Sequence, residues 1–205
     1  MKIAIIGAGN VGSTLGRAWQ RRGHEITYGV RQPDDSRYSD LGADATDNAT
    51  AVADADVVAL CTPWQGTQAA ITACGDLAGK VLIDCTNPLT PDVTALELGH
   101  TTSGAEQVAA WAPGARVCKA MNQIGAPMMD SPAVPSTPVM FVCGDDSDAK
   151  DVAAQLVREL GFETLDAGDL TVARLLEPLA LLWIHMALRR GLGAGWALGV
   201  LRGER

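Results

Sequence analysis

Short apolar runs and helix-period segments alternate along most of the chain. Each run has four to six residues and is continuously apolar, rather than alternating with polar positions. A strand that is apolar on both faces is typical of a parallel sheet covered by helices on each side. The strands predicted in this way cover residues 3–6, 26–30, 57–61, 81–84, 116–121 and 140–143.

The segments between these runs carry helix signals. Residues 11–18 place Val, Leu and Ala at helical spacing, and Gly23 supplies a C-terminal stop. Ser103 and Glu106 form a capping box that opens a second helix, and a third is predicted within residues 145–161. This strand–helix alternation predicts the α/β class, with a doubly wound, mostly parallel Rossmann-type sheet.

The end of the chain departs from the alternation. We assign residues 1–168 to the Rossmann-like part and residues 169–205 to a short C-terminal helical segment of the same domain, which leaves no room for a large helical second domain. A helix that is apolar on most faces must be buried or meet a partner. We expect the segment to cover the sheet, to wall a ligand pocket and to form a homodimer; the alternative is a monomer whose tail is simply core. Its apolar residues are Leu175, Leu176, Leu179, Leu181, Leu182, Trp183, Ile184, Met186 and Leu188.

Charge narrows the choice of ligand. The 205 residues carry 16 Lys and Arg against 24 Asp and Glu, a net charge of −8. Nucleic acids and anionic membranes are polyanions, so neither is an expected partner. Residues 1–37 are the exception, with 6 basic and 3 acidic side chains, a balance of +3. One small anionic ligand could therefore bind near the N-terminus.

The cysteines, the histidines and the longest apolar stretch indicate that disulfides, a metal site and a membrane span are absent. The five Cys are odd in number and form no C-x-x-C, so they indicate small buried hydrophobes in a reducing cytoplasm. The three His lie far apart and predict no metal site. The apolar stretch between Arg174 and Arg189 has 14 residues, too few to span a bilayer, so we expect a cytoplasmic protein.

Residues 7–12 match G-x-G-x-x-G directly after a strand and at the start of a helix. In that context Gly7 permits a tight turn, Gly9 admits a pyrophosphate close to the backbone, and Gly12 lets helix and strand pack closely. Asn10 and Val11 open the helix, whose free N–H groups and dipole favour an anion. The sequence therefore predicts a dinucleotide site, against the alternative of a purely structural glycine turn.

The end of the next predicted strand indicates which dinucleotide binds. An NAD site normally places Asp or Glu there to bond the ribose hydroxyls. Arg31 occupies this position, and its guanidinium suits the 2′-phosphate of NADP. We therefore predict NADP(H), with residues 1–168 as the NADP-binding domain. Two alternatives remain: Arg31 is a solvated surface residue, or Asp34 or Asp35 reaches the ribose.

Three later loops follow strand ends, where ligands bind in such sheets. Thr, Asn and Gln there can bond a nicotinamide amide, and Pro, Trp and Ile can cover its ring. The bland alternatives are Asx turns for the Asn residues and core packing for the Trp. Asn122 is also the candidate catalytic residue. The predicted contacts are Thr62, Pro63, Trp64, Asn87, Pro88, Asn122 and Ile124.

No acid–base pair is evident in the sequence. Lys119 lies inside a predicted strand and His185 on an apolar helix, so we interpret both as satisfied structural residues before considering them as proton donors. Direct hydride transfer between two bound rings needs orientation more than a protein base.

Taken with these residues, the chain resembles the NADP-dependent reductases of the deazaflavin coenzyme F420. The same domain type occurs as the cytoplasmic oxidoreductase of transmembrane metalloreductases. The resemblance implies direct hydride transfer between NADPH and a flavin-like ring, and a dimer formed partly through the C-terminal helices. It is carried by Gly7–Gly12, Gly29–Arg31, Thr62–Trp64, Lys119–Gly125, Cys143–Asp146 and Leu165–Asp169.

Two positions depart from the family pattern. Val30 stands where the family often has Ser before the phosphate-binding Arg. Asn122 stands where characterised deazaflavin reductases can carry His and the metalloreductases carry Asn. The leading hypothesis is an NADP-dependent oxidoreductase that uses a small-molecule acceptor, either coenzyme F420 or a flavin. The alternatives are reduction of a small imine, carbonyl or ferric-flavin substrate, and an NADP-binding sensor without turnover.

Overall fold

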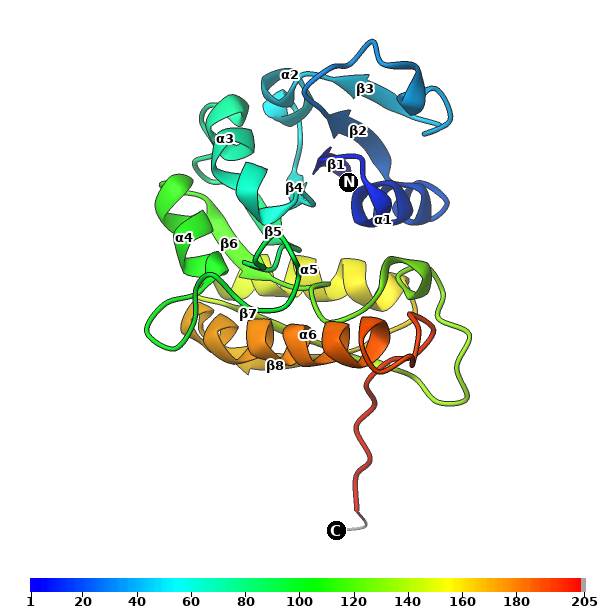
Figure 1. The fold of residues 1–205 in the computed structure, drawn as a ribbon. Coiled ribbons are helices and arrows are strands. Elements are labelled where there is room, and N and C mark those ends of the chain that lie inside the picture. The colour runs from blue at the N-terminus through cyan, green and yellow to red at the C-terminus, as the bar shows by residue number, and fades with distance from the viewer. Residues whose placement is uncertain (204–205) are drawn as a thin grey trace.

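The computed structural model describes residues 1–203, which form one eight-stranded sheet between helical layers (Figure 1). The strand order is β3-β2-β1-β4-β5-β6-β7-β8, and every neighbouring pair is parallel except β6 and β7. The predicted class, a doubly wound and mostly parallel sheet with a C-terminal helix, is confirmed. The strands are β1 (Lys2–Ile6), β2 (Glu25–Gly29), β3 (Asp44–Thr46), β4 (Val57–Leu60), β5 (Val81–Asp84), β6 (Arg116–Lys119), β7 (Val139–Gly144) and β8 (Glu163–Gly168).

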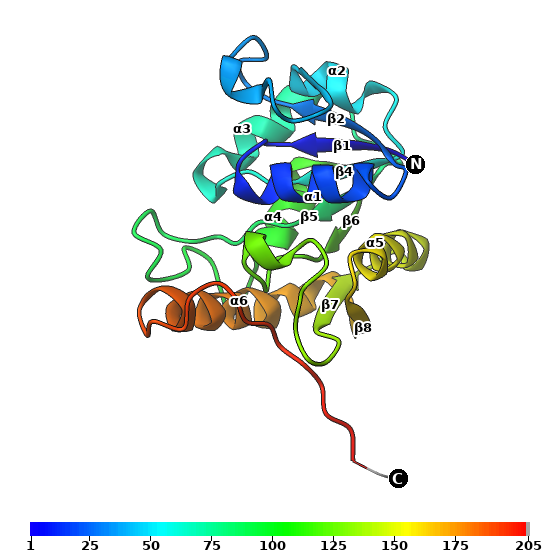
Figure 2. The same cartoon turned by 90° about the vertical axis from the view of Figure 1, so that its right-hand side faces the viewer.

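Two apolar layers hold the helices against the sheet. On one face, α1 and α5 cover the strands, and the Trp19 indole of α1 donates to the Leu156 carbonyl of α5 at 3.1 Å (Figure 2). On the other face, α2, α3, α4 and the start of α6 form the second layer. The helices are α1 (Asn10–Gln20), α2 (Asn48–Ala53), α3 (Trp64–Cys74), α4 (Gly104–Trp111), α5 (Ser147–Glu159) and α6 (Ala173–Leu188), with short 3-10 turns at Ser36–Tyr38, Ala126–Met128 and Leu170–Val172.

The sequence analysis missed β3 and β8, and both are edge strands. Their sequences, Asp-Ala-Thr and Glu-Thr-Leu-Asp-Ala-Gly, contain no fully buried residue. An edge strand is not enclosed on both faces, so it lacks the continuous apolar run by which the six inner strands were recognised.

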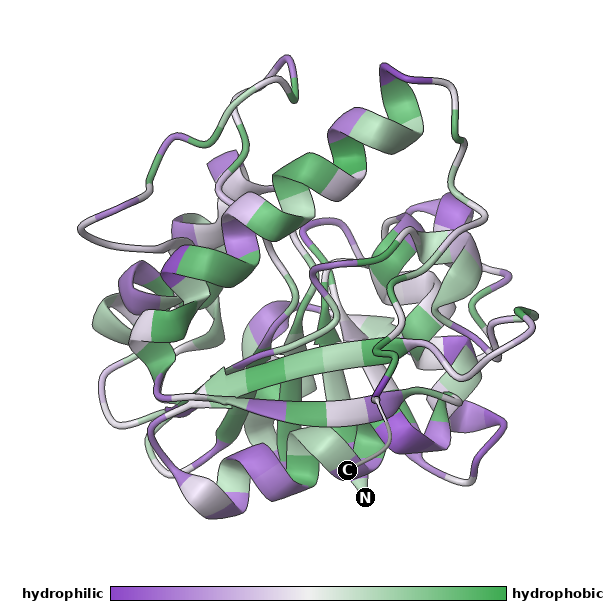
Figure 3. Ribbon diagram, turned by 90° about the horizontal axis from the view of Figure 1, so that it is seen from below, coloured by the Kyte–Doolittle hydropathy of each residue, from purple (hydrophilic) through white to green (hydrophobic). Residues whose placement is uncertain are grey.

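Helix α6 buries only one of its faces. Ala173, Leu176 and Ala180 are buried, whereas Leu175, Leu182 and Leu188 are 69%, 57% and 67% exposed. Figure 3 views the molecule from below and shows α6 at the surface with many apolar residues along it. The expectation that this helix covers the sheet therefore holds for one face only, and the other leaves a row of leucines in solvent.

Two expectations about this segment are corrected. His185 is exposed and is not a core histidine. Leu170–Leu188 forms 19 helical residues with a mean hydropathy of 1.4, which is long and apolar enough to cross a membrane by length and composition alone, in contrast to the 14-residue stretch considered above. Only 39% of its most apolar window is buried inside this fold, and one helix of this kind is weak evidence for a membrane span.

Candidate functional site

The glycine turn lies between β1 and α1. Gly7 has φ +97°, in the left-handed region, and its N–H continues the ladder to the Gly29 carbonyl at 2.9 Å. A Cβ at Gly12 would overlap the Gly7 carbonyl oxygen. A Cβ at Gly9 would meet nothing within 4 Å. Gly7 and Gly12 thus have the tight-turn and close-packing geometry predicted for them, and the backbone at Gly9 faces open space.

Helix α1 begins at this turn without a side-chain cap. Gly9 is its N-cap residue, and the first turn contains no acidic side chain. Asn10 and Val11 therefore begin a helix whose leading N–H groups have no capping side chain, at the positive end of the helix dipole. A pyrophosphate would meet both conditions, so the turn fits a dinucleotide.

Arg31 stands beyond the end of β2 and is exposed. Among residues 1–203, no group lies within hydrogen-bond or ion-pair distance of its guanidinium. Asp35, by contrast, pairs with Arg37 at 2.9 Å and accepts from the Arg37 N–H at 3.0 Å. Asp35 is therefore already engaged, whereas Asp34 is exposed and stays open as a ribose partner. Arg31 is the exposed guanidinium that could meet a phosphate. We call the Gly7–Gly12 turn with Arg31 the phosphate side of the site.

The loop after β4 lies against the glycine turn. The position of a Cβ on Gly7 would be 3.2 Å from the Thr62 methyl group. The Thr62 hydroxyl is hydrogen-bonded to that of Thr67 at 2.9 Å, and Pro63 is the N-cap residue of α3. Trp64 packs on Trp111 of α4, with ring centroids 5.3 Å apart. Thr62 and Pro63 thus lie where predicted, whereas Trp64 has the packing role weighed against cofactor contact.

The loops after β5 and β6 are joined through their asparagines. The Asn87 amide donates to the Asn122 carbonyl at 2.9 Å, and the Asn122 amide donates to the Asn87 side-chain oxygen at 3.0 Å. Asn122 also donates to the Leu176 carbonyl at 3.2 Å and accepts from Gln123 at 3.1 Å. We call the Asn87–Asn122 pair the amide side of the site.

Asn122 has little capacity left for a ligand. Both of its amide hydrogens and one oxygen lone pair are already used inside the protein. Pro88 is buried beside Gly104, and Ile124 is 7% exposed within the apolar core. The structure therefore brings Asn87 and Asn122 together but gives Pro88 and Ile124 core packing. The catalytic assignment of Asn122 stays a prediction.

Beneath the amide side lies a buried ionic cluster. The Lys119 ammonium contacts Asp84 at 2.6 Å, Glu177 at 2.9 Å and the Thr86 carbonyl at 2.9 Å. Burial lowers the pKa of Lys119, but the carboxylates of Asp84 and Glu177 outweigh burial and hold that pKa above its ordinary value. Lys119 is therefore a satisfied cation and a poor proton donor near neutral pH.

Sequence analysis missed Asp84 and Glu177 as members of this cluster. The available signal was a carboxylate inside an otherwise apolar element, at the end of the β5 run and within the apolar tail helix. Such a carboxylate needs a buried partner. The sequence alone does not show that β5, β6 and α6 come together around one ammonium group.

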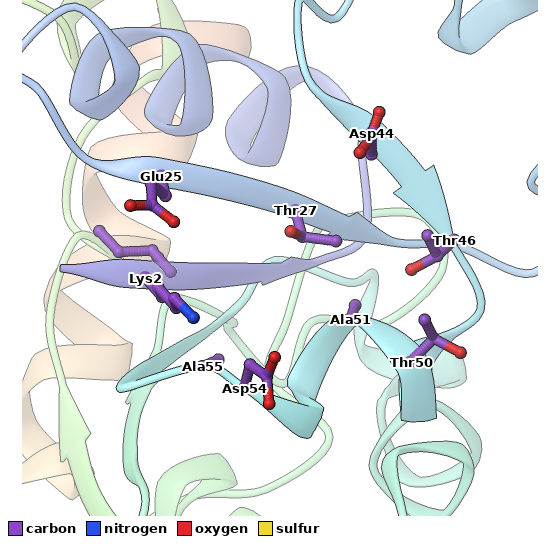
Figure 4. Close-up of a pocket in the computed structure, with 10 residues that line it drawn as sticks. Lys2, Glu25, Thr27, Asp44, Thr46, Thr50, Ala51, Asp54 and Ala55 are labelled. Carbon is purple, nitrogen blue, oxygen red and sulfur yellow. The ribbon is translucent and has the colours of Figure 1, made fainter.

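A groove elsewhere on the surface does not belong to this site (Figure 4). It encloses about 290 Å³ between α2, the first half of β1 and β2, and both ends of β3. Lys2 and Glu25 line it at the starts of their strands, whereas the glycine turn and Arg31 follow the strand ends. Its carboxylates, Glu25, Asp44 and Asp54, would repel phosphates. Within residues 1–203 no group of three His, Cys, Asp or Glu is placed to hold a metal ion.

Comparison with known proteins adds to this geometry. The family model "NADP oxidoreductase coenzyme F420-dependent" matches residues 2–88. The crystal structure of a candidate F420-dependent NADP reductase from Arthrobacter sp. FB24 superposes with a TM-score of 0.91 at 33% identity, covering 98% of this chain and 100% of that one. The chain belongs to the F420-dependent NADP oxidoreductase family. It is thus an NADP-dependent oxidoreductase with a Rossmann-type fold, as the resemblance implied.

Two named relatives match most of this chain. The F420-dependent NADP reductase of Methanothermobacter thermautotrophicus is 29% identical, over 92% of this chain and 90% of its own length. Metalloreductase STEAP3 of Rattus norvegicus is 30% identical over 88% of this chain, which spans only 36% of that protein. The family match at residues 2–88 includes the phosphate side, the loop after β4 and Asn87.

Proposed function

We propose that this oxidoreductase transfers a hydride directly between NADP(H) and the ring of coenzyme F420 or a flavin. The observation that carries the proposal is the pairing of an uncapped glycine turn with a free Arg31, at the same sheet edge as the Asn87–Asn122 pair. The likeness to named F420-dependent NADP reductases supports the choice of acceptor.

The protein residues would bind and orient rather than exchange protons. Gly9, Asn10 and Val11 would hold the pyrophosphate through backbone N–H groups, and Arg31 the 2′-phosphate. Thr62, Pro63 and the amide side would face the nicotinamide. The bound cofactor supplies the hydride. Lys119 is fully buried and paired, so it is not suited to serve as an acid.

Two features beyond the site belong to the same proposal. The row of exposed leucines on α6 supports a homodimer formed through the C-terminal helices. The named F420-dependent reductase supports a small-molecule acceptor. The net charge of −8 supports a soluble, cytoplasmic protein with no nucleic-acid or membrane partner.

An acceptor panel tests the function. The protein is mixed with NADPH and, separately, with coenzyme F420, FAD, FMN or a ferric chelate, while absorbance follows NADPH oxidation. Turnover with F420 or with a flavin supports the proposal and selects the acceptor.

The likeness to STEAP3, a metalloreductase, favours one second candidate, flavin-mediated reduction of iron. Turnover that requires both a flavin and the ferric chelate would select it. Tight NADPH binding without turnover on any acceptor would contradict both and favour a sensor.

A further inference from the structure

Glu177 occupies an unusual place in the molecule. It lies within the most apolar helix and is 1% exposed. Its carboxylate accepts from the Gly104 N–H at 2.8 Å and the Ala105 N–H at 3.1 Å, and contacts Lys119 at 2.9 Å. It therefore connects α6 to the first turn of α4 and to β6.

The Glu177 carboxylate contributes to the fold, because it accepts from two buried N–H groups and pairs with the Lys119 ammonium. A buried ion pair is nevertheless often no more stabilising than apolar residues that replace both partners. What the ion pair adds is a fixed position of α6 relative to β6.

Two pairs of side chains join β5 and the loop after it to β6 and the loop after it. Lys119 belongs to the lower pair and Asn122 to the upper pair. In the sheet register, Asp84 of β5 lies beside Lys119 of β6, and these side chains form the lower ion pair. Three residues beyond the end of each strand, Asn87 and Asn122 form the upper, reciprocal amide pair. The ion pair and the amide pair together hold both loops at the candidate nicotinamide position.

Helix α6 contacts both pairs with consecutive residues. The Leu176 carbonyl accepts from the Asn122 amide at 3.2 Å, and the Glu177 carboxylate binds Lys119 at 2.9 Å. A displacement of this turn of α6 would therefore disturb the ion pair and the amide pair at the same time.

The backbone between the two pairs is in an unfavourable conformation. Met121 has φ +60° and is 1% exposed. A non-glycine residue in the left-handed region is strained and persists only where its surroundings fix it. Lys119 on one side of Met121 and Asn122 on the other supply that fixation, so the direction of the 121–125 loop depends on their anchors.

We infer that Glu177 is a positioning residue, which fixes the nicotinamide end of the site by holding Lys119 while the adjacent Leu176 holds Asn122. The inference rests on the proposed function, because it assumes that NADPH places its nicotinamide at the amide side. It assigns no chemical step to Glu177.

The experiment compares two probes in Glu177→Gln. The probe 2′,5′-ADP tests the phosphate side alone, and NADPH tests the whole site; the fluorescence of bound NADPH reports the surroundings of its nicotinamide. We expect 2′,5′-ADP affinity within about twofold of wild type, NADPH binding weaker by about tenfold, as for one lost neutral hydrogen bond, and loss of the NADPH fluorescence change.

Glu106→Gln is the matched control. Glu106 also joins α4 to α6, through Arg174 at 2.9 Å, but it does not contact Lys119. Both NADPH readouts should stay at wild-type values in this variant. Unchanged NADPH binding and fluorescence in Glu177→Gln would overturn the inference, and equal losses for both probes would assign Glu177 a merely structural role.

Glu177→Asp keeps the inference testable if Glu177→Gln does not fold. It retains the charge but shortens the reach to Lys119, and it should give the same split between probes; an equal loss for both would contradict the inference. If wild-type protein binds neither probe, the proposed function fails before the positioning role is tested.

Discussion

The phosphate side and the amide side both lie at the carboxyl ends of the strands of one sheet, yet they are built in opposite ways. The phosphate side consists of backbone N–H groups without a side-chain cap and one guanidinium that has no partner among residues 1–203. The amide side consists of side chains that bond one another, above an ammonium with three oxygen partners. One side offers free groups to a ligand, whereas the other uses its polar groups to fix its own shape.

This difference separates two effects of mutation. A change at Gly9 or Arg31 should weaken binding and leave folding intact, because within residues 1–203 a Gly9 Cβ would meet no atom and the Arg31 guanidinium has no partner. A change beneath the amide side should first lower stability, because it leaves buried polar groups unpaired.

Lys119→Met tests the buried end of the contrast and should have the largest effect. It leaves Asp84 and Glu177 as buried carboxylates without their cation, which costs about 3–5 kcal/mol of unfolding free energy. Urea denaturation measures the loss. In the control Lys150→Met, the ion pair to Asp166 at 2.8 Å is at the surface, and the loss should stay below about 1 kcal/mol. Similar losses in both variants would contradict the contrast.

Gly12→Ala and Gly9→Ala separate the structural role of the glycine turn from its role in binding. The new Cβ at Gly12 overlaps the Gly7 carbonyl oxygen, so stability should fall by about 3 kcal/mol, the upper range for overpacking. Gly9→Ala enters open space and should keep its stability but bind NADPH more weakly, since the Cβ occupies the approach of the pyrophosphate. Thermal unfolding with and without NADPH separates the two results. An unaltered NADPH affinity in Gly9→Ala would remove the pyrophosphate from this turn.

Arg31→Ala tests the free guanidinium. NADPH binding should weaken by about 1.5–3 kcal/mol, the value of a hydrogen bond to a charged group, and NADH binding should hardly change. Titration calorimetry with both cofactors measures the difference. Arg37→Ala is the control, because Arg37 is already paired with Asp35. Equal losses for NADPH and NADH would contradict the role of Arg31.

The smallest effect concerns acid. The hydrogen bond from Arg174 lowers the pKa of Glu106 below its ordinary 4.5, against burial, which raises it. A carboxyl with a lower pKa in the folded state stabilises the protein above the unfolded pKa and loses that contribution as pH falls through the folded value. Melting temperatures should therefore fall less steeply below pH 4.5 in Glu106→Gln than in wild type. An identical slope would show that this pair contributes nothing.

The same contrast explains what could be predicted from the sequence. The inner strands and the glycine turn depend on local pattern: continuous apolar runs, and glycines where a Cβ would overlap or where φ is positive. Arg31 was recognisable because one position at a strand end decides the cofactor. These features require only neighbours along the chain.

The remainder depends on contacts between distant segments. Nothing near Trp64 in the sequence shows that Trp111 is its packing partner, and nothing near Glu177 shows that it reaches Lys119 and the start of α4. His185 was expected in the core because its helix is apolar, but only one face of that helix is covered. Edge strands β3 and β8 were missed for lack of an apolar run.

The polar character of those edge strands bears on how the protein avoids aggregation. An open sheet edge exposes unpaired N–H and C=O groups to any extended chain, and short strands or charged side chains discourage such pairing. Strand β3 has three residues, beginning with Asp44, and β8 carries Glu163 and Asp166. Strand-to-strand polymerisation is thus disfavoured at both edge strands of the sheet.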